Sequence, residues 1–274
     1  MTLKLDGPLL LAGAGNMGYA LLMGWLERGL DPARIIVQDP APSPRVKEQL
    51  DWHRIQVRAE VRSLPEVPAV LLVAVKPQVM DEVFPPLAQL VRSKTVVLSV
   101  AAGRRIDGFE VHLPKATAVV RAMPNTPASI GRGITVACAN ARAAPAQRSL
   151  CGELLGAVGE VHWVESEDQL AAVTALSGGG PAYVYLLTEV LAEAGIGQGL
   201  PEALARRLAR VTVEGAGELS RLSPDEPATL RKNVTSPGGT TVEALKVLTG
   251  PGGLQPLFDR AIAAATARAR ELAD

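Results

Sequence analysis

The sequence contains few aromatic residues, two cysteines and three histidines. Phe, Trp and Tyr make up only 3% of the 274 residues, so aliphatic side chains and alanine must form most of the core. Cys138 and Cys151 are too far apart in sequence for a close-spaced metal site or a redox pair, and His53, His112 and His162 are equally dispersed. The composition therefore argues against a disulfide-stapled miniprotein and against a metalloenzyme.

The sequence also lacks an excess of charge of one sign. It has 28 basic and 28 acidic side chains and no Lys- or Arg-rich run, so nucleic acid is not an expected partner. No apolar run approaches the roughly 18 to 20 residues of a membrane span. The first residues, Met1–Gly7, include an acid and a glycine where a secretory signal needs a continuous apolar stretch. We therefore expect a cytoplasmic protein without a metal, nucleic-acid or membrane partner.

Short apolar runs alternate with helix-like stretches through the first 165 residues. Leu9–Ala12 is apolar throughout, as expected of a strand buried on both faces of a parallel sheet. A helix over Tyr19–Arg28 and a strand over Arg34–Asp39 complete a strand–helix–strand unit. Further strands are predicted over Ala69–Val75, Thr95–Ala101, Ala118–Arg121, Ile134–Ala139 and Val161–Val164, and helices over Val79–Val91 and Pro145–Leu155. This alternation predicts an α/β fold with a Rossmann-like, doubly wound parallel sheet.

Strand-like runs disappear after about residue 166, and helix-forming residues dominate the remainder. The predicted helices are Asp168–Leu176, Ala182–Ala194, Pro201–Leu219, Pro227–Val234, Val242–Leu248 and Pro256–Ala273. We therefore predict two domains, a nucleotide-binding domain over residues 1–165 and an all-helical domain over residues 166–274.

The glycine run Gly13–Gly18 follows the first strand and opens a helix, as in dinucleotide-binding folds. There the glycines permit a tight turn, close approach of a pyrophosphate and close helix packing. The next strand ends at Asp39, about 20 residues later, where a carboxylate binds an adenosine ribose and repels a 2'-phosphate. Alternatively, Asp39 begins a proline turn and faces water. Arg34, Arg45 and Lys47 are close enough in sequence to support binding of a 2'-phosphate. The motif predicts a nicotinamide cofactor, and Asp39 favours NADH.

Three other loops follow predicted strands, and the carboxyl ends of strands are where doubly wound sheets bind ligands. These loops are Ala74–Gln78, Ala101–Gly103 and Arg121–Pro127. Lys76 is equally consistent with a solvated loop lysine. In the second half, Ser177–Pro181 is consistent with either a helix break or a close-contact corner.

The loop Thr235–Thr241 combines glycines and hydroxyl residues directly before a predicted helix. Backbone N–H groups at a helix start, together with hydroxyls, suit an anion such as a substrate carboxylate. Helix capping alone is the alternative interpretation.

Together these motifs resemble those of the pyrroline-5-carboxylate reductases. The resemblance runs almost end to end, through Gly13–Gly18, Ala74–Pro77, Arg121–Pro127, Leu176–Tyr183 and Val234–Thr241, in that order. It implies an oxidoreductase of proline biosynthesis, in which NADPH or NADH gives hydride to the C5 imine carbon of 1-pyrroline-5-carboxylate and forms L-proline. It also implies a dimerisation domain intertwined with that of a partner, often decamers of five dimers, and active sites between the cofactor domain of one subunit and the helices of another.

The resemblance also carries site residues over by position. Thr241 is expected to hydrogen-bond the ring nitrogen and to relay a proton, while its loop holds the substrate carboxylate. Glu167 is expected at the substrate, although an acid favoured by a helix N-terminus is an equal alternative. The substrate set is Glu167, Ser236, Gly239, Thr240 and Thr241. The cofactor set is Ala12, Gly13, Ala14, Gly15, Asn16, Met17, Asp39, Ala74, Val75, Lys76, Pro77, Ala101, Ala102, Gly103 and Asn233.

Three positions depart from the family pattern. Gly179 replaces a small polar residue, Asp39 replaces a residue that is often neutral, and Val61 falls where relatives often place a polar side chain against the cofactor. The resemblance implies NADPH as the usual cofactor, and Asp39 puts that preference in doubt. These departures bear on cofactor preference more than on the reaction.

Three other functions compete with this interpretation. A β-hydroxyacid dehydrogenase would use a lysine early in its helical domain, and the segment between Glu167 and Arg231 contains no lysine. A cofactor-binding sensor would not need the hydroxyls of Ser236 and Thr241. A reductase of the six-membered cyclic imine acid is the strongest of the three alternatives, because one methylene changes the discrimination between two substrates by only about 1–3 kcal/mol.

Overall fold

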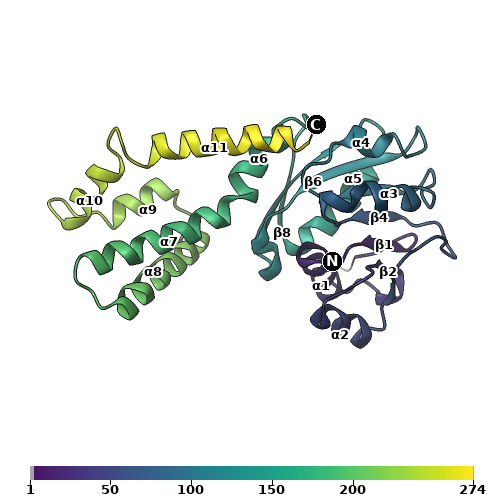
Figure 1. Cartoon of the computed structure of the whole chain (residues 1–274), viewed down its shortest axis with the longest axis horizontal. Coiled ribbons are helices and arrows are strands. Elements are labelled where there is room, and N and C mark those ends of the chain that lie inside the picture. Colours follow the sequence, from purple (N-terminus) through teal and green to yellow (C-terminus); the bar gives the residue numbers. More distant parts are fainter. Residues whose placement is uncertain (1–2, 274) are drawn as a thin grey trace. The chain divides into compact units, whose positions relative to one another are not determined.

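The computed structural model describes residues 3–273, which form two compact units (Figure 1). One contains residues 3–178 together with 265–273, and the other contains residues 179–264. The sheet of the first unit ends at Trp163, close to the predicted boundary. By its contacts, however, this unit extends to Gly178 and also includes residues 265–273. The domain boundary after residue 165 stays a prediction.

The first unit is built on one eight-stranded sheet with the order β3-β2-β1-β4-β5-β6-β7-β8. All neighbouring strands are parallel except β6 and β7, so the prediction of a wholly parallel sheet is wrong at this pair. Residues 124–132 join these two strands, too few for the crossover that a parallel pair requires. The strands are β1 (Leu9–Ala12), β2 (Ile35–Gln38), β3 (Gln56–Arg58), β4 (Val70–Val73), β5 (Val96–Ser99), β6 (Ala118–Met123), β7 (Gly133–Ala139) and β8 (Gly159–Trp163).

Helices cover both faces of this sheet. They are α1 (Asn16–Glu27), α2 (Pro44–Trp52), α3 (Met80–Ala88), α4 (Ile106–Glu110), α5 (Pro145–Leu155) and α6 (Gln169–Val173). Alternate residues of a strand point to opposite faces, so Leu9 and Leu11 pack with α1, α2 and α5, whereas Leu10 and Ala12 pack with α3, α4 and α6. The resulting two-sided core agrees with the predicted Rossmann-like fold.

The second unit is helical throughout its described residues, as predicted. Its elements are α7 (Gly180–Gly197), α8 (Glu202–Leu222), α9 (Pro227–Asn233), α10 (Thr240–Leu248) and the first part of α11 (Leu254–Glu271). A π-helical turn over Thr174–Gly178 precedes α7, so the predicted helix Asp168–Leu176 changes from α-helix to π-helix at Thr174. At this turn, a Cβ on Gly178 would lie only 2.7 Å from Cε of Met123, which supports the close-contact interpretation of the Ser177–Pro181 corner.

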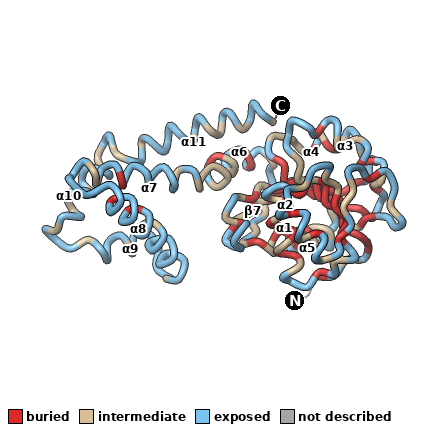
Figure 2. The backbone as a smooth tube through the Cα atoms, turned by 60° about the horizontal axis from the view of Figure 1, so that its bottom comes forward, coloured by how far each residue is buried: buried red, intermediate tan, exposed pale blue. Residues whose placement is uncertain are grey.

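The helical unit leaves most of its described residues exposed (Figure 2). Among its described residues only Ala192, Ala205 and Ala209 are buried. Large apolar side chains on α7 and α8 are exposed instead: Val184, Tyr185, Leu186, Leu187, Val190, Leu191, Leu204, Leu208, Val211, Leu219 and Leu222. An apolar face of this extent marks an interaction surface.

One long helical stretch corrects an expectation from the sequence. Gln169–Gly197 is, by length and composition alone, apolar enough to cross a membrane, although no such run was predicted. The stretch includes α6, which contributes the buried Leu170 to the core of the sheet unit, and the exposed apolar residues of α7. The same composition is typical of a helix that other protein surface covers.

Candidate active site

The glycine loop after β1 forms the centre of the candidate cofactor site. Gly13 donates its N–H to the carbonyl of Gln38 and has a φ of +90°, which a side chain would strain. A Cβ on Gly18 would lie 2.1 Å from the carbonyl oxygen of Gly13, so only glycine allows the helix to pack here. A Cβ on Gly15, in contrast, would meet nothing within 4 Å. The absence of a side chain at Gly15 therefore leaves space in front of the loop.

Asp39 directly follows β2 and does not simply face water. Its Oδ2 accepts a 2.9 Å hydrogen bond from the N–H of Ala14, and its Oδ1 accepts one of 2.9 Å from the N–H of Ala41. The neighbouring Gln38 uses its side-chain oxygen to accept the N–H of the buried Val61 at 2.7 Å. The carboxylate thus stands beside the glycine loop, where an adenosine ribose lies in dinucleotide-binding folds.

Two further predicted loops lie at the same edge of the sheet. Ala74 donates its N–H to the carbonyl of Ala12 at 2.8 Å, and Val100 donates to Val73 at 3.0 Å. The loops after β1, β4 and β5 therefore follow one another at the carboxyl edge, where the strand order reverses between β1 and β4. The structure brings together there the predicted residues Ala12–Met17, Asp39, Ala74–Pro77 and Ala101–Gly103, with Lys76 exposed.

The predicted substrate loop belongs to the helical unit. Gly239 is the N-cap of α10 and donates its N–H to the carbonyl of Ser236 at 3.0 Å, which folds the loop into a tight turn. Thr240 and Thr241 form the first turn of α10, where backbone N–H groups have no intrahelical acceptor. Ser236, Thr240 and Thr241 are at least partly exposed, and Asn233 is exposed at the end of α9. This loop can offer hydroxyls and N–H groups to an anion.

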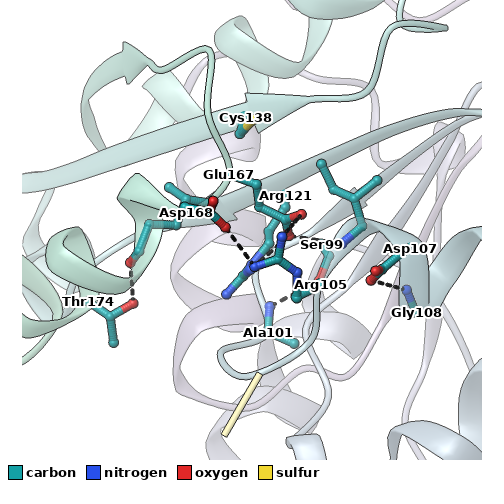
Figure 3. Close-up of polar contacts among 12 residues, drawn as sticks. Ser99, Ala101, Arg105, Asp107, Gly108, Arg121, Cys138, Glu167, Asp168 and Thr174 are labelled. Carbon is teal, nitrogen blue, oxygen red and sulfur yellow. Dashed lines mark hydrogen bonds and ion pairs between the residues drawn. The ribbon is translucent and has the colours of Figure 1, made fainter. Parts of the chain in front are cut away.

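Glu167 lies in the first unit and is surrounded by hydrogen-bond donors (Figure 3). Its Oε1 accepts a 2.7 Å hydrogen bond from Nη1 of Arg121 and a 2.9 Å hydrogen bond from the N–H of Ile106. Its Oε2 lies 3.6 Å from Nη2 of Arg105, whose Nη1 donates to Asp168 at 2.9 Å. The sequence analysis did not include Arg105, and it placed Arg121 only at the start of a loop after a strand. Arg121 lies instead within β6, and its partner Glu167 is 46 positions away.

Both cysteines are buried free thiols in the first unit. Burial raises the pKa of Cys151 to about 12, and burial together with the charge of Glu167 raises the pKa of Cys138. A thiol with a raised pKa is a poor nucleophile at neutral pH. Within residues 3–273, no group of three or more His, Cys, Asp or Glu side chains is placed to hold a metal ion.

Comparison with known proteins identifies both units. A family model described as pyrroline-5-carboxylate reductase dimerisation matches residues 167–272, and one described as NADP oxidoreductase, coenzyme F420-dependent, matches residues 9–103. The pyrroline-5-carboxylate reductase of Pseudomonas aeruginosa is 38% identical over 262 residues, which cover 96% of this chain and 95% of that protein. The enzyme of the same name from Synechocystis sp. is 38% identical over 263 residues, 96% of this chain and 97% of that one.

Solved structures agree with these relatives. The pyrroline-5-carboxylate reductase of Coxiella burnetii superposes with a TM-score of 0.90 at 36% identity, covering 98% of this chain and 100% of that one. The Plasmodium falciparum pyrroline carboxylate reductase, solved with NADP bound, gives a TM-score of 0.81 at 25% identity and covers 98% and 99%. Since sequence and fold agree over nearly the whole length of both chains, this protein belongs to the pyrroline-5-carboxylate reductase family.

Proposed function

We propose that this protein is an NAD(P)H-dependent pyrroline-5-carboxylate reductase that catalyses the last step of proline biosynthesis. It reduces the C=N bond of 1-pyrroline-5-carboxylate, and the product is L-proline. The observation that carries the proposal is the 38% identity to enzymes of this name over 96% of the chain. Both loop systems that the reaction needs are present, one at the carboxyl edge of the sheet and one at the start of α10.

The residues at the carboxyl edge fit a dinucleotide. The open space at Gly15 admits a pyrophosphate, and the N–H groups at the start of α1 attract its charge. We assign the cofactor to Ala12–Met17, Asp39, Ala74–Pro77 and Ala101–Gly103, and the family resemblance adds Asn233 to the cofactor residues. When bound, the dihydronicotinamide supplies the hydride; the protein loops orient it and exclude water.

We assign the substrate to the loop before α10. Ser236, Gly239 and Thr240 hold the carboxylate through hydroxyls and backbone N–H groups at the helix start. Thr241 donates its hydroxyl hydrogen bond to the ring nitrogen and relays a proton there. A protonated imine accepts hydride readily, so near-attack geometry matters more than a strong base. Glu167, which was also predicted at the substrate, is given a different role below.

The choice between the two cofactors depends on Asp39. We propose a preference for NADH, since a carboxylate about 4 Å from a 2'-phosphate repels it by roughly 4 kcal/mol per unit charge before screening.

The Asp39→Ser variant is expected to shift the ratio of kcat/KM values for NADPH and NADH towards NADPH by about 10- to 100-fold. Both KM values will rise, because Ala14 loses its acceptor, so the ratio is the quantity to measure. Asp39→Asn is the matched control for the loop, since an amide oxygen can still accept the N–H of Ala14 while the charge is gone. An unchanged ratio in both variants would exclude the proposed role of Asp39.

The apolar face of the helical unit supports a homodimer, and we propose decamers of five dimers as its further assembly. A second copy that covers this face also explains the apolar composition of Gln169–Gly197, so we propose a soluble, cytoplasmic protein. The Leu186→Glu variant is expected to give monomers in light scattering in place of the wild-type oligomer, because it places a charge on this face. Trp52→Glu, which changes an exposed apolar side chain of the sheet unit, is the control and should keep the wild-type mass. A wild-type mass for both variants would show that α7 lies outside the interface.

The function is tested by the oxidation of NADH and NADPH with 1-pyrroline-5-carboxylate, with proline identified by mass spectrometry. Turnover with either cofactor supports the proposal. Faster turnover of the six-membered cyclic imine acid would reassign the substrate. Cofactor binding without turnover of either imine would indicate a sensor.

A further inference from the structure

Arg121 is a buried cation in the middle of the sheet. It lies in β6, next to Ser99 of β5 and Cys138 of β7, and only 6% of the residue is exposed. The neighbouring Val120 and Ala122 are apolar and buried. A buried arginine persists only when its charge is neutralised and its donors are satisfied.

Glu167 supplies that neutralisation and does more. The 2.7 Å pair with Arg121 is nearly buried, with side-chain exposures of 8% for Arg121 and 13% for Glu167. The same oxygen accepts the N–H of Ile106, the first residue of α4. One carboxylate therefore joins strand β6, the end of the β5–α4 loop and the segment before α6 (Figure 3).

A second, outer pair supports this arrangement. Arg105 precedes Ile106 and donates to Asp168, which follows Glu167 in the chain. The hydrogen bond to Asp168 and the charge of Glu167 raise the pKa of the Arg105 guanidinium above its ordinary value. Asp168 thus binds the side chain of Arg105, and Glu167 binds the backbone N–H of Ile106. These two contacts fix the end of the loop.

The loop held in this way is Ala101–Gly103, to which we assign cofactor contact. At its other end, Ser99 accepts the N–H of Ala101 through its hydroxyl at 3.2 Å. Its three residues carry no side chain longer than a methyl group. Such a loop can contact a ligand mainly through its backbone, so the position of that backbone determines what it contributes.

We propose that the buried Arg121–Glu167 pair is a positioning device that sets the Ala101–Gly103 loop for cofactor binding. Both are positioning residues that act through the loop, and neither touches the substrate. The inference rests on the proposed function, because that function assigns this loop to the cofactor.

The test compares Arg121→Met, Glu167→Gln and the double variant with the wild type. We expect the Kd of NADH and of NADPH to rise about tenfold in each single variant, because a displaced loop loses its backbone contacts with the cofactor. The KM for the imine substrate, measured at saturating cofactor, should stay within about twofold. The Kd of the double variant should rise by less than the product of the two single-variant factors, since the two residues act as one unit.

Glu110→Gln is the control variant. Glu110 lies on α4, as Ile106 does, and its carboxylate pairs with Arg142. Removing this carboxylate should leave the Kd of both cofactors unchanged. If Glu167→Gln raises the KM for the imine and leaves the Kd of the cofactor unchanged, Glu167 is a substrate residue and the proposal is wrong. A lower melting temperature with wild-type Kd and KM values would make the pair merely structural.

A second variant at Arg121 covers the case in which Arg121→Met does not fold. Arg121→Lys keeps the positive charge and therefore the fold, and it should also raise the Kd of the cofactor. Binding is measured by cofactor fluorescence without turnover. If the wild-type protein binds cofactor but does not reduce the imine, the proposed reaction is refuted. The Kd values of the variants then still test the positioning role.

Discussion

A Gly15→Ala variant is expected to fold normally and to lose most of its affinity for NADH and NADPH. The added Cβ meets no protein atom within 4 Å, so the loop itself accommodates it. It does, however, fill the space into which we place the cofactor pyrophosphate, and the close approach of backbone to phosphate is lost. We expect the Kd to rise about 100-fold, equivalent to about 2.7 kcal/mol, in a fluorescence titration.

The stability of this variant separates lost binding from lost folding. Gly15 is the N-cap of α1, and alanine is a poorer N-cap, so we expect a small decrease in melting temperature of about 2–4 °C. Gly152→Ala in α5 is the matched control, because its Cβ would meet only Nε1 of Trp163 at 3.8 Å and lies within a helix. A Kd for Gly15→Ala that equals that of Gly152→Ala would show that no dinucleotide lies against this loop.

The second large effect is expected from Thr241→Val. Valine has the shape of threonine without the hydroxyl, so the imine nitrogen loses its hydrogen-bond donor and the proton relay. General acid–base groups contribute about 100- to 10,000-fold, and we expect kcat to fall at least about 100-fold. The affinity for cofactor alone should not change, because we assign Thr241 to the substrate and not to the cofactor. Stopped-flow kinetics and cofactor titration measure the two quantities separately.

Two other threonine variants complete this experiment. Thr241→Ser keeps the hydroxyl and should retain most of the activity. Thr249→Val changes another threonine of the helical unit, whose Oγ1 donates to the carbonyl of Leu245 at 2.7 Å, and should have no effect on kcat. If Thr241→Val and Thr249→Val have the same kcat, the proton reaches the nitrogen from another donor.

The sequence predicted the central strands and the long helices, because their apolar patterns are strong. It did not predict α2, β3 or α4. β3 (Gln56–Arg58) has two polar residues of three and lies at the sheet edge, so it has no apolar run to detect. α4 is only five residues long. The antiparallel direction of β7 depends on the short connection that precedes it, which is visible only once the strand ends are known.

The candidate site was predictable where it follows from topology. The loops that contain Gly15, Lys76 and Ala101 follow parallel strands, and the carboxyl ends of such strands always meet at one edge. The Arg121–Glu167 pair was not, because no local pattern indicates which distant acid neutralises a buried arginine. The direction of the Asp39 carboxylate likewise depends on a hydrogen bond to Ala14, which the sequence leaves open.

The sheet unit is discontinuous in sequence, which affects the order in which it forms during synthesis. Residues 265–273 belong to it by contact, and the carbonyl oxygen of Leu272 lies 3.0 Å from where a Cβ on Gly103 would be. A ribosome therefore delivers all the strands and the whole of residues 179–264 before it delivers this last contact of the β5 loop. Since domains form from the N-terminus during synthesis, a nascent chain acquires its sheet early and the final surroundings of Gly103 only after the helical unit has been made.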